Sequence, residues 1–348
     1  MKVCIVPPPG SWRHQGGHKT QQFQTARALS REGLSVVVAD AEFAASGGFD
    51  VVHFFGDPAP LLAFGRPRGQ LIVSPVHFPA SVQLGPVRTS TTSLGTGVDR
   101  VRHVGRCVRH PRDRRRQWDE LRRSLRAVAS ADKLVVNSQA EGKLLVEDLH
   151  RYVGAVSVPP IHVAYSGVED LFFSGSSSRG RALVGDAPFV LCVARPEQRK
   201  NQVALSRAMQ GVDRRLVLIG EVLPGNERFL ARCREMLPSL LHLSELGPRD
   251  LADVYAAAEV HVLASHFETT GLATLEALAA GTPCVVGRGS CVAEYYGTAV
   301  RSVDPNNYRD IRRGILEALD RPTGSEAATA HRYPWTRTGQ ELLAAYEA

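Results

Sequence analysis

The sequence lacks the features that mark several specialised classes of protein. No apolar run in its 348 residues approaches the ~18 that span a bilayer, and the apolar start, which ends at three prolines, is too short for a signal-peptide core. The six cysteines are scattered, without a Cys-x-x-Cys pair or a cluster with histidine, so neither a disulfide framework nor a structural zinc site is expected. We expect buried, reduced cysteines and a cytoplasmic location.

Two common phosphate-binding motifs are also missing. The dinucleotide fingerprint G-x-G-x-x-G does not follow the first predicted strand, and the P-loop motif G-x-x-x-x-G-K-[ST] is absent. Both absences count against a typical NAD enzyme and a P-loop ATPase. The content of 43% hydrophobic and 22% charged residues is that of an ordinary globular chain, and the length suggests about two domains.

The apolar pattern predicts two α/β units. Short runs of strand length alternate with amphipathic helical segments from residue 3 to 164, and again from residue 189 to 319. Between them, residues 174–180 have the composition of a flexible linker. The expected fold class is α/β, with Rossmann-like parallel sheets in an N-terminal domain over 1–168 and a C-terminal domain over 169–332. Such sheets bind ligands at the carboxyl ends of their strands, and two in tandem are expected to face a shared cleft.

The strongest polar cluster follows a predicted strand of the second unit. Glu268 lies in the loop after the strand, and Glu276 lies one turn into the next predicted helix. Thr269, Thr270 and Gly271 can cap and open that helix. The free backbone N–H groups of Thr270, Gly271 and Leu272 are then expected to favour an anion, above all a phosphate. A carboxylate one turn further along can accept two hydrogen bonds from a vicinal diol such as a ribose. Taken alone, two such glutamates are more often solvated side chains.

Three weaker motifs follow other predicted strands. Arg195 and Lys200 come after the first strand of the second unit, where two cations suit a diphosphate, although alone they also fit a basic surface loop. Gly16 and Gly17 come after the first strand of the chain and permit close approach of a ligand. His77 follows a buried strand of the first unit and could exchange a proton with a hydroxyl, although a lone histidine is more often structural.

In combination, these motifs make the chain similar to the retaining glycosyltransferases of family 4, which have the GT-B fold. The most specific part is the Glu-x7-Glu spacing with arginine and lysine upstream. The matching pieces occur in family order over nearly the whole chain: Gly16-Gly17, residues 49–53, the His77 loop, residues 130–138, residues 161–168, residues 195–201, residues 216–220, Glu268, Glu276, residues 281–283 and Trp335. The chain departs from the family at residues 165–167 and 243–245.

The resemblance implies how a donor would be held. Arg195 and Lys200 would neutralise the leaving diphosphate of a UDP- or GDP-sugar, and Glu276 would hold the ribose hydroxyls. Glu268 and the backbone over 270–272 would grip the transferred sugar. No Asp-x-Asp motif occurs in the sequence, which agrees with catalysis by side-chain cations without a metal, and no cofactor is expected.

The resemblance also implies roles for the first unit. Gly16 and Gly17 would let the backbone approach the diphosphate. His18 and His77 would lie on the acceptor side, with His77 at the junction of sugar and acceptor as a catalytic partner of Glu268. The last segment, residues 333–348, would cross back to pack on the first domain. Transfer with retention of the anomeric configuration would be expected.

The net charge of +7 has one source. Eleven arginines but only three acidic residues lie between residues 100 and 126, whereas acidic and basic residues balance over 171–348. The segment is either a solvated face or a contact for an anionic acceptor or a lipid surface at the inner face of a membrane, with Arg114, Arg115 and Arg116 as candidates. Nucleic acid is not expected, because the segment holds a single aromatic residue for stacking.

Two classes of function therefore stay open. The first is a glycosyltransferase that moves a sugar from a nucleotide sugar to a hydroxyl of a small-molecule, glycan or lipid-linked acceptor. The second is a non-catalytic two-domain protein that binds a nucleotide or another anion on the same fold. A GT-B phosphorylase is disfavoured, because no lysine stands in a convincing context for pyridoxal phosphate.

Overall fold

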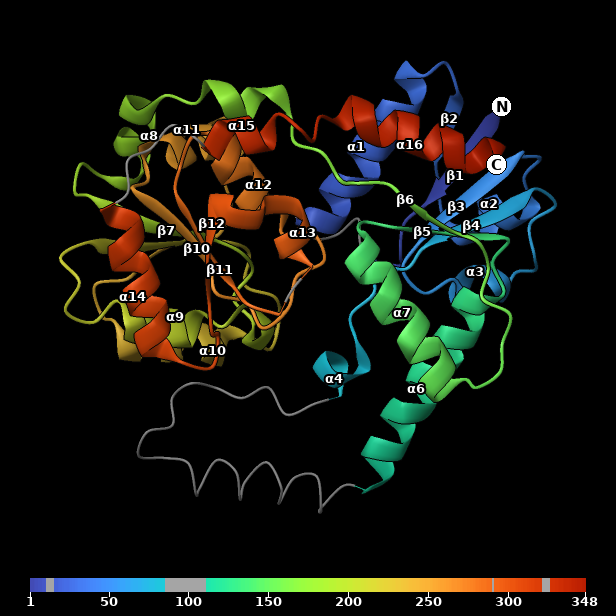
Figure 1. The fold of residues 1–348 in the computed structure, drawn as a ribbon, viewed down its shortest axis with the longest axis horizontal. Helices are drawn as coiled ribbons and strands as arrows, with labels where there is room; N and C mark the ends of the chain where they lie inside the picture. The colour runs from blue at the N-terminus through green and yellow to red at the C-terminus, as the bar shows by residue number, and fades with distance from the viewer. Residues whose placement is uncertain (11–15, 85–110, 290, 321–325) are drawn as a thin grey trace. The chain divides into compact units, whose positions relative to one another are not determined.

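The structure is a computed structural model that describes residues 1–10, 16–84, 111–289, 291–320 and 326–348, apart from the side chains of His18 and residues 111–114. The chain forms two compact units (Figure 1). The first ends at Ser166 and also contains Trp335–Ala348, and the second comprises Gly167–Pro334. The sequence places these boundaries at 168 and 332. The last helix returns to the first unit, as expected.

The first unit contains a six-stranded parallel sheet in the order β2-β1-β3-β4-β5-β6. Its strands are β1 (Lys2–Val6), β2 (Ser35–Val38), β3 (Val51–Phe55), β4 (Gln70–Ser74), β5 (Lys133–Val136) and β6 (Ile161–Val163). In the register of the sheet, Cys4 lies opposite Val37 on one side and Val52 on the other. The strands β1, β3, β4 and β5 are short and apolar because helices bury both of their faces.

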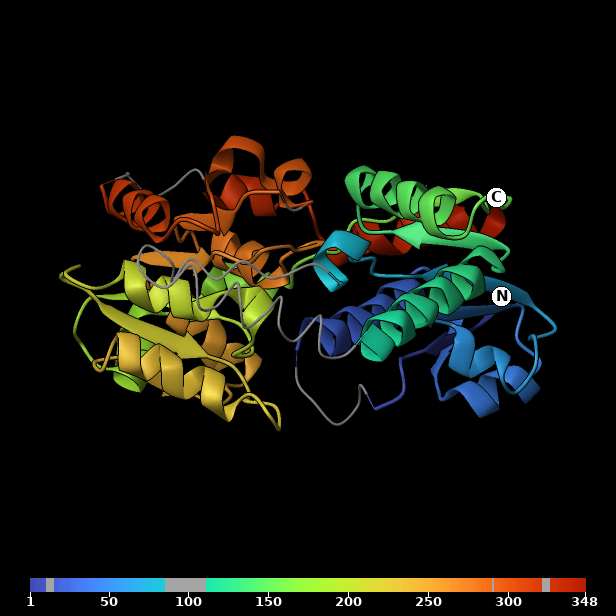
Figure 2. The same cartoon turned by 90° about the horizontal axis from the view of Figure 1, so that it is seen from below.

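Helices form a layer on each side of this sheet, as Figures 1 and 2 show. They are α1 (Gly17–Arg31), α2 (Ala41–Ser46), α3 (Ala59–Leu62), α4 (Ala80–Gln83), α6 (Pro111–Ala129), α7 (Gln139–Tyr152) and α16 (Trp335–Glu347). Successive residues of β1 point to opposite faces. Cys4 packs with α2, α3, α6 and α7, whereas Ile5 packs with α1 and α16.

Buried polar contacts fix α16 to the sheet. His53 on β3 bonds through Nδ1 to the Tyr346 hydroxyl at 2.6 Å and through Nε2 to the Ser74 hydroxyl at 2.8 Å. The Lys133 ammonium donates to the Ala345 carbonyl at 3.0 Å. Burial lowers the pKa of His53 to about 3, so the ring is neutral and joins its two hydroxyl partners without a charge. The returning helix is therefore part of the core of the first unit.

The second unit contains another six-stranded parallel sheet, in the order β12-β11-β10-β7-β8-β9. Its strands are β7 (Phe189–Val193), β8 (Arg215–Ile219), β9 (Leu241–Leu243), β10 (Val260–Leu263), β11 (Cys284–Gly287) and β12 (Val300–Val303). The central strand β7 pairs with β8 on one side and with β10 on the other, so the chain builds the sheet outward in both directions from β7.

Two groups of helices cover this second sheet (Figure 1). The helical segments are η2 (Asp170–Ser174), α8 (Ser177–Val184), η3 (Gln198–Lys200), α9 (Gln202–Ala208), α10 (Glu227–Met236), α11 (Pro248–Ala257), α12 (Leu272–Ala279), α13 (Val292–Tyr296), η4 (Gly297–Ala299), α14 (Tyr308–Leu319) and α15 (Glu326–Ala330). Helices α9, α10 and α14 share one apolar core with the sheet. Helix α11 packs against α8 and α12, and α15 packs against α12.

The expectation of a flexible linker over 174–180 is wrong, because this segment forms the end of η2 and half of α8. The Ser176 hydroxyl accepts from the Arg179 backbone N–H at 3.4 Å and caps the helix. The Arg179 guanidinium pairs with the Asp253 carboxylate at 2.7 Å. A Cβ atom at Gly180 would lie 2.1 Å from the Asp253 carbonyl oxygen, so this glycine permits close contact between α8 and α11.

Two other expectations concern cysteines and membranes. Five cysteines are buried and free, and Cys107 lies outside the described residues. Burial raises the pKa of the thiols of Cys192 and Cys233 to about 12, so they act as inert apolar side chains. Within the described ranges, no helix has both the length and the apolar character that crossing a membrane requires.

Candidate functional site

The candidate site lies where the strand order of the second sheet changes direction. Strands β7 and β10 are neighbours, but the chain leaves β7 toward β8 and leaves β10 toward β11. In an open parallel sheet, the crevice beyond the carboxyl ends of two such strands is the usual ligand site. Arg195 and Lys200 follow β7, and Glu268 follows β10. The topology therefore brings together two motifs that are far apart in the sequence.

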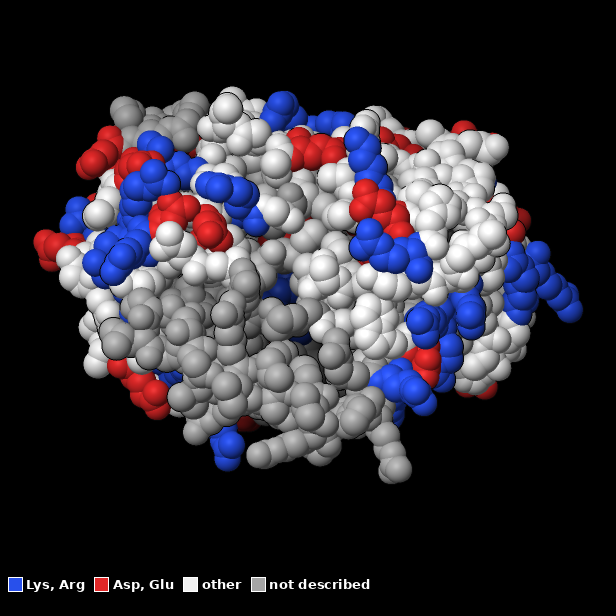
Figure 3. Space-filling model, turned by 60° about the horizontal axis from the view of Figure 1, so that its bottom comes forward, with Lys and Arg blue, Asp and Glu red and all other residues white. Residues whose placement is uncertain are grey.

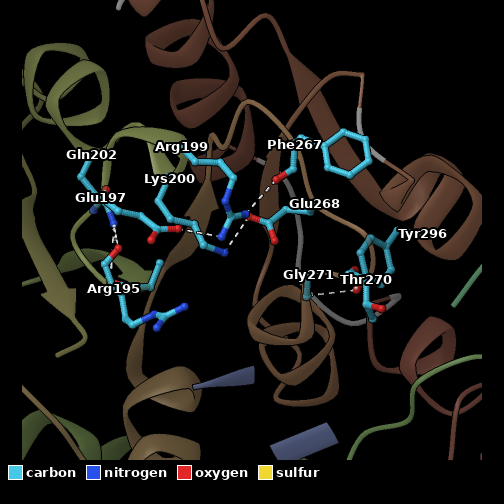
Figure 4. A network of polar contacts seen from close by, with 11 residues as sticks. Arg195, Glu197, Arg199, Lys200, Gln202, Phe267, Glu268, Thr270, Gly271 and Tyr296 are labelled. Atoms are coloured by element: carbon cyan, nitrogen blue, oxygen red, sulfur yellow. Dashed lines mark hydrogen bonds and ion pairs between the residues drawn. The ribbon is translucent and has the colours of Figure 1, made fainter. Parts of the chain in front are cut away.

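Glu268 is the centre of a network of ion pairs (Figure 4). Its Oε1 atom lies 2.7 Å from Nζ of Lys200 and 3.3 Å from Nη1 of Arg199. Nη1 of Arg199 also donates to the Phe267 carbonyl at 3.0 Å, and Nη2 lies 2.6 Å from Oε1 of Glu197. The side chains of Glu268, Lys200 and Arg199 are only 10%, 15% and 24% exposed, so water screens their charges poorly.

The pKa shifts in this network follow from burial and charge. Burial alone would raise the pKa of Glu268, but Lys200 and Arg199 outweigh it and hold the pKa below its ordinary value. Burial lowers the pKa of Lys200, with a further contribution from Arg199, while Glu268 opposes the change. The carboxylate is thus ionised at neutral pH, and Lys200 already has an anionic partner.

Arg195 differs from Lys200 in its contacts. Its backbone carbonyl accepts from the Gln202 side-chain amide at 2.9 Å, which fixes the loop. A Cβ atom at Gly220 would lie 2.8 Å from the Arg195 backbone nitrogen, so glycine at the end of β8 leaves room for that loop. Its guanidinium has no hydrogen-bond or ion-pair partner among the residues that the structure describes. Arg195 therefore offers a cation that a ligand can engage without breaking an existing pair.

The start of α12 supplies backbone donors beside this network. Gly271 has a φ of 69°, a conformation that glycine adopts readily, and caps the helix without a side-chain bond. Thr270 therefore does not cap the helix, and its backbone carbonyl instead accepts from the Tyr296 hydroxyl at 2.7 Å (Figure 4). The backbone N–H groups of Gly271 and Leu272 have no acceptor in the described part of the chain. They have the orientation and partial charge that suit an oxyanion.

Glu276 lies in a different electrostatic environment from Glu268. Its Oε2 atom accepts from the Tyr255 hydroxyl at 2.9 Å, and no ion pair to a described cation involves it. Burial raises the pKa of Glu276 to about 8, with a contribution from the Glu169 carboxylate, although the Tyr255 bond opposes the shift. This carboxyl group is therefore largely protonated at pH 7, and a ligand that needs a carboxylate there must displace the proton.

In the first unit, the sequence candidates also lie at carboxyl ends of strands. Gly16 and Gly17 are exposed at the start of α1, after β1, and Gly16 has a φ of 149°. The change of direction in this sheet lies between β1 and β3, so the two glycines are at the expected ligand edge. The side chain of His18 lies outside the described residues.

His77 follows β4 and is buried, with 5% of its surface exposed. Its Nε2 atom lies 2.9 Å from the Asp148 carboxylate, and its backbone N–H donates to Glu141 at 2.5 Å. The preceding residue, Val76, has a φ of 47°, a costly conformation for a β-branched residue. Asp148 also accepts from the Ala80 backbone N–H at 2.8 Å, so contacts to α7 hold the strained loop in place.

The arginine candidates lie on α6. The side chain of Arg114 is outside the described residues, whereas Arg115 and Arg116 are exposed. Arg116 pairs with Glu120 at 2.9 Å, one turn further along the helix. In the described part of the face in Figure 3, basic side chains lie among acidic ones. Leu121 and Leu125 on the same helix are buried, so the charged side chains lie on the opposite, solvated face.

Several functional candidates were not predicted from the sequence. Arg199 and Glu197 lie between two predicted cations, and their proximity to Arg195 and Lys200 is the only signal they offered. The contact of Tyr255 with Glu276 joins residues 21 positions apart and leaves no local pattern. Glu141 could have been found from the sequence, because Ser138 and Glu141 form an S-x-x-E capping pattern. In the structure, the Ser138 hydroxyl accepts from the Glu141 N–H at 3.1 Å.

Comparison with known proteins identifies glycosyltransferase relatives. Residues 175–333, nearly all of the second unit, match the family model "Glycosyl transferases group 1". A D-inositol 3-phosphate glycosyltransferase of Mycolicibacterium smegmatis is 32% identical over 236 residues, which cover 63% of this chain and 53% of the relative. Its counterpart from Saccharomonospora viridis is 33% identical over 63% of this chain and 56% of the relative. The chain thus spans about half the length of these relatives.

Solved structures share the fold over the whole chain. HepE from Anabaena in complex with UDP-glucose has a TM-score of 0.73 and 15% identity, covering 100% of this chain and 99% of that chain. Sucrose-phosphate synthase from Thermosynechococcus elongatus has a TM-score of 0.66 and 18% identity, covering 99% and 94%. A trehalose-phosphate synthase from Burkholderia xenovorans, bound to glucose-6-phosphate, has a TM-score of 0.70 and 11% identity, covering 100% of both chains. At these identities the likeness concerns the fold alone, and it confirms the expected α/β fold with two parallel sheets.

Proposed function

We propose that this protein is a glycosyltransferase that moves a sugar from a nucleotide sugar to a hydroxyl group of an acceptor, with the donor bound by the second unit. The observation that carries the proposal is the network of Lys200, Arg199 and Glu268 where the strand order changes, together with Arg195, whose guanidinium has no partner among the described residues. The group 1 family match over the same unit and the names of the relatives support it.

Each side chain has a task that fits its contacts. Arg195 and Lys200 meet the diphosphate, and the N–H groups of Gly271 and Leu272 add backbone donors. As the bond between the sugar and the diphosphate breaks, negative charge develops on the leaving oxygen, and fixed cations lower the barrier. Glu268 accepts from hydroxyls of the sugar.

Two features of the reaction belong to the same proposal. Glu276, in its ionised form, accepts two hydrogen bonds from the ribose diol. Transfer proceeds with retention of the anomeric configuration, as the family resemblance implies, so the acceptor hydroxyl attacks from the face that the diphosphate leaves. The product anomer, read by NMR from a donor of known configuration, tests the second feature.

We further propose that the acceptor carries a phosphate and binds to the first unit. Three observations support it: the excess of arginine over residues 100–126, the named substrate of the D-inositol 3-phosphate glycosyltransferases, and the glucose-6-phosphate bound to a structural neighbour. Transfer to an uncharged glycan would instead indicate a glycan acceptor. Activity that depends on lipid vesicles would indicate a lipid-linked acceptor.

We propose that the reaction needs no metal, because side-chain cations and a helix start are available for the diphosphate. We expect initial rates to stay within twofold of the untreated enzyme after EDTA treatment and gel filtration. A loss of activity that Mg²⁺ or Mn²⁺ restores would contradict the assignment of Arg195 and Lys200 as sufficient phosphate partners.

The function is tested first by binding and then by turnover. Thermal unfolding is measured with UDP, GDP and ADP, because a ligand at about 100 times its Kd adds about 2.7 kcal/mol of stability. Release of nucleoside diphosphate is then followed with UDP-glucose and GDP-mannose, using inositol 3-phosphate and glucose-6-phosphate as acceptors. Binding without turnover for every pair would favour the non-catalytic alternative, and no binding at all would contradict the donor site.

A further inference from the structure

Arg199 joins the two loops of the candidate site through both main chain and side chain. Its backbone carbonyl accepts from the His266 N–H at 2.9 Å. Its Nη1 atom donates to the Phe267 carbonyl at 3.0 Å and to the Glu268 carboxylate at 3.3 Å, as Figure 4 shows. Nη2 is held by Glu197 at 2.6 Å. The guanidinium therefore stays in place through partners other than Glu268.

Lys200 and Arg199 share one oxygen, Oε1 of Glu268, which creates a competition when a ligand arrives. An ammonium is a compact point charge on a flexible stem, so a diphosphate can draw it away from a carboxylate. A guanidinium presents a planar fork of donors that is already fixed on two further acceptors. The ligand is therefore expected to take Lys200 and leave Arg199 in position.

We propose that Arg199 is a positioning residue that holds the Glu268 carboxylate in place when the donor diphosphate draws Lys200 away. This inference rests on the proposed function of the site. Without Arg199, binding of the diphosphate would leave Glu268 in a nearly buried position without a cation. An uncompensated buried carboxylate is costly, so it would take up a proton or turn away from the sugar.

The consequence is a change in pH dependence as well as in rate. Arg199 and Lys200 both lower the pKa of Glu268. With Arg199 replaced, this pKa rises, so the acidic limb of the kcat/KM profile moves to higher pH. A side chain that only supported the fold would reduce activity by the same factor at every pH.

The experiment compares Arg199→Gln and Arg199→Lys with Arg232→Gln, a matched change at an exposed arginine on α10. Release of UDP from UDP-glucose and of GDP from GDP-mannose is measured from pH 4 to 9, because the pKa of Glu268 in the unmodified protein lies below its ordinary value, and UDP and GDP affinities are measured in parallel. For Arg199→Gln we expect the acidic limb to move to higher pH, so that the loss of kcat/KM is several-fold at the acidic end of the range and becomes smaller as the pH rises. For Arg199→Lys we expect a smaller shift of the acidic limb than for Arg199→Gln. For Arg232→Gln we expect the pH profile of the unmodified protein.

The outcomes separate this inference from the function on which it rests. If the unmodified protein binds neither UDP nor GDP, the proposed function fails. If it binds and turns over while Arg199→Gln keeps the shape of the pH profile, the positioning role of Arg199 is overturned. Should Arg199→Gln not fold, Arg199→Lys carries the test, because a single ammonium cannot contact Glu197, Phe267 and Glu268 together. An unshifted profile for Arg199→Lys would then overturn the role.

Discussion

The two units place a buried glutamate at the same edge of similar sheets but surround it with opposite chemistry. In the second unit, Glu268 contacts two cations, which hold its pKa below the ordinary value although burial alone would raise it. In the first unit, Glu141 accepts hydrogen bonds from the backbone N–H groups of His77 and Asn137, at 2.5 and 2.7 Å, and from the Asn137 side chain at 2.9 Å. Burial raises the pKa of Glu141 despite these bonds.

The difference shows that one architecture can be specialised for two tasks. Lys200 in the second unit can exchange its carboxylate partner for a phosphate, which suits a site that must respond to a charged ligand. The contacts of Glu141 in the first unit are hydrogen bonds to a strained loop, which suits a site whose shape must stay fixed. We therefore expect substitutions in the second unit to change donor chemistry, and substitutions around Glu141 to change stability first.

The largest effect is expected from removing a diphosphate cation. Arg195→Ala and Lys200→Ala should each lower turnover by about 30- to 1,000-fold, because each removes a charge-assisted contact worth roughly 2–4 kcal/mol to the developing negative charge. Arg232→Ala on the exposed face of α10 is the matched control and should leave the rate unchanged. Near-normal rates in both test variants, measured as release of nucleoside diphosphate, would rule out this donor site.

The two buried glutamates should separate stability from catalysis. Glu268→Ala should lower turnover at least tenfold while nucleoside diphosphate still binds, because it removes an acceptor for the sugar but keeps Arg195 and Lys200. Glu141→Gln should instead cost about 1–3 kcal/mol of stability, since its amide N–H₂ would face backbone donors that need an acceptor. Urea unfolding and UDP titration of both variants measure this contrast. If Glu268→Ala lost stability and Glu141→Gln lost only turnover, the comparison between the two units would be reversed.

Glu276 should link donor binding to pH. Because its pKa is raised to about 8, the ribose diol finds a carboxylate only after the proton has left. Nucleoside diphosphate affinity should therefore rise about tenfold between pH 7 and 9, following the ionised fraction. Tyr255→Phe removes a bond that lowers this pKa, so affinity at pH 7 should fall further. Glu276→Gln should bind more weakly and lose the pH dependence. A pH-independent Kd in the unmodified protein would contradict the ribose role.

The regular elements were predictable because their signals are local. The strands β8 and β10 and the helices α10 and α14 lie within the predicted alternation over residues 189–319, since each combines an apolar period with polar ends. The short strands β9 and β12 were not predicted, because three or four residues of mixed burial carry little pattern. Helix α8 was mistaken for a linker because its serines and glycine have the composition of a flexible segment, whereas Gly180 permits its close contact with α11.

The candidate site was predictable in its position but not in its pairing. Motifs after β7 and β10 indicated cations and carboxylates at one edge of a sheet, and parallel topology brings them together. No pattern in the sequence indicates that Lys200 contacts Glu268, or that Arg199 shares the same oxygen. These contacts depend on the directions of side chains in segments 68 residues apart. The periodic patterns of helices and strands carry no information over that separation.

The smallest effect is expected on α6, where the arginine face either meets an anionic acceptor or is only solvated. Replacing Arg114, Arg115 and Arg116 by serine should raise the acceptor KM a few-fold at low salt and leave the UDP or GDP Kd unchanged. The effect should shrink at high salt, because exposed charges are screened within a Debye length of about 8–10 Å.

His77→Ala supplies the contrast for that test. It should cost stability and, through the loop that His77 anchors, lower turnover without a salt dependence, because the His77 ring is buried against Asp148 rather than exposed to ions. Both variants are assayed at 20 mM and 500 mM NaCl with the acceptor that gives transfer. If the triple variant has the KM of the unmodified enzyme at low salt, the arginines form a solvated face, since an electrostatic contact with an anionic acceptor would be strongest there. The charge of the first unit would then have no part in acceptor binding, and the contrast between the units would rest on Glu141 and Glu268 alone.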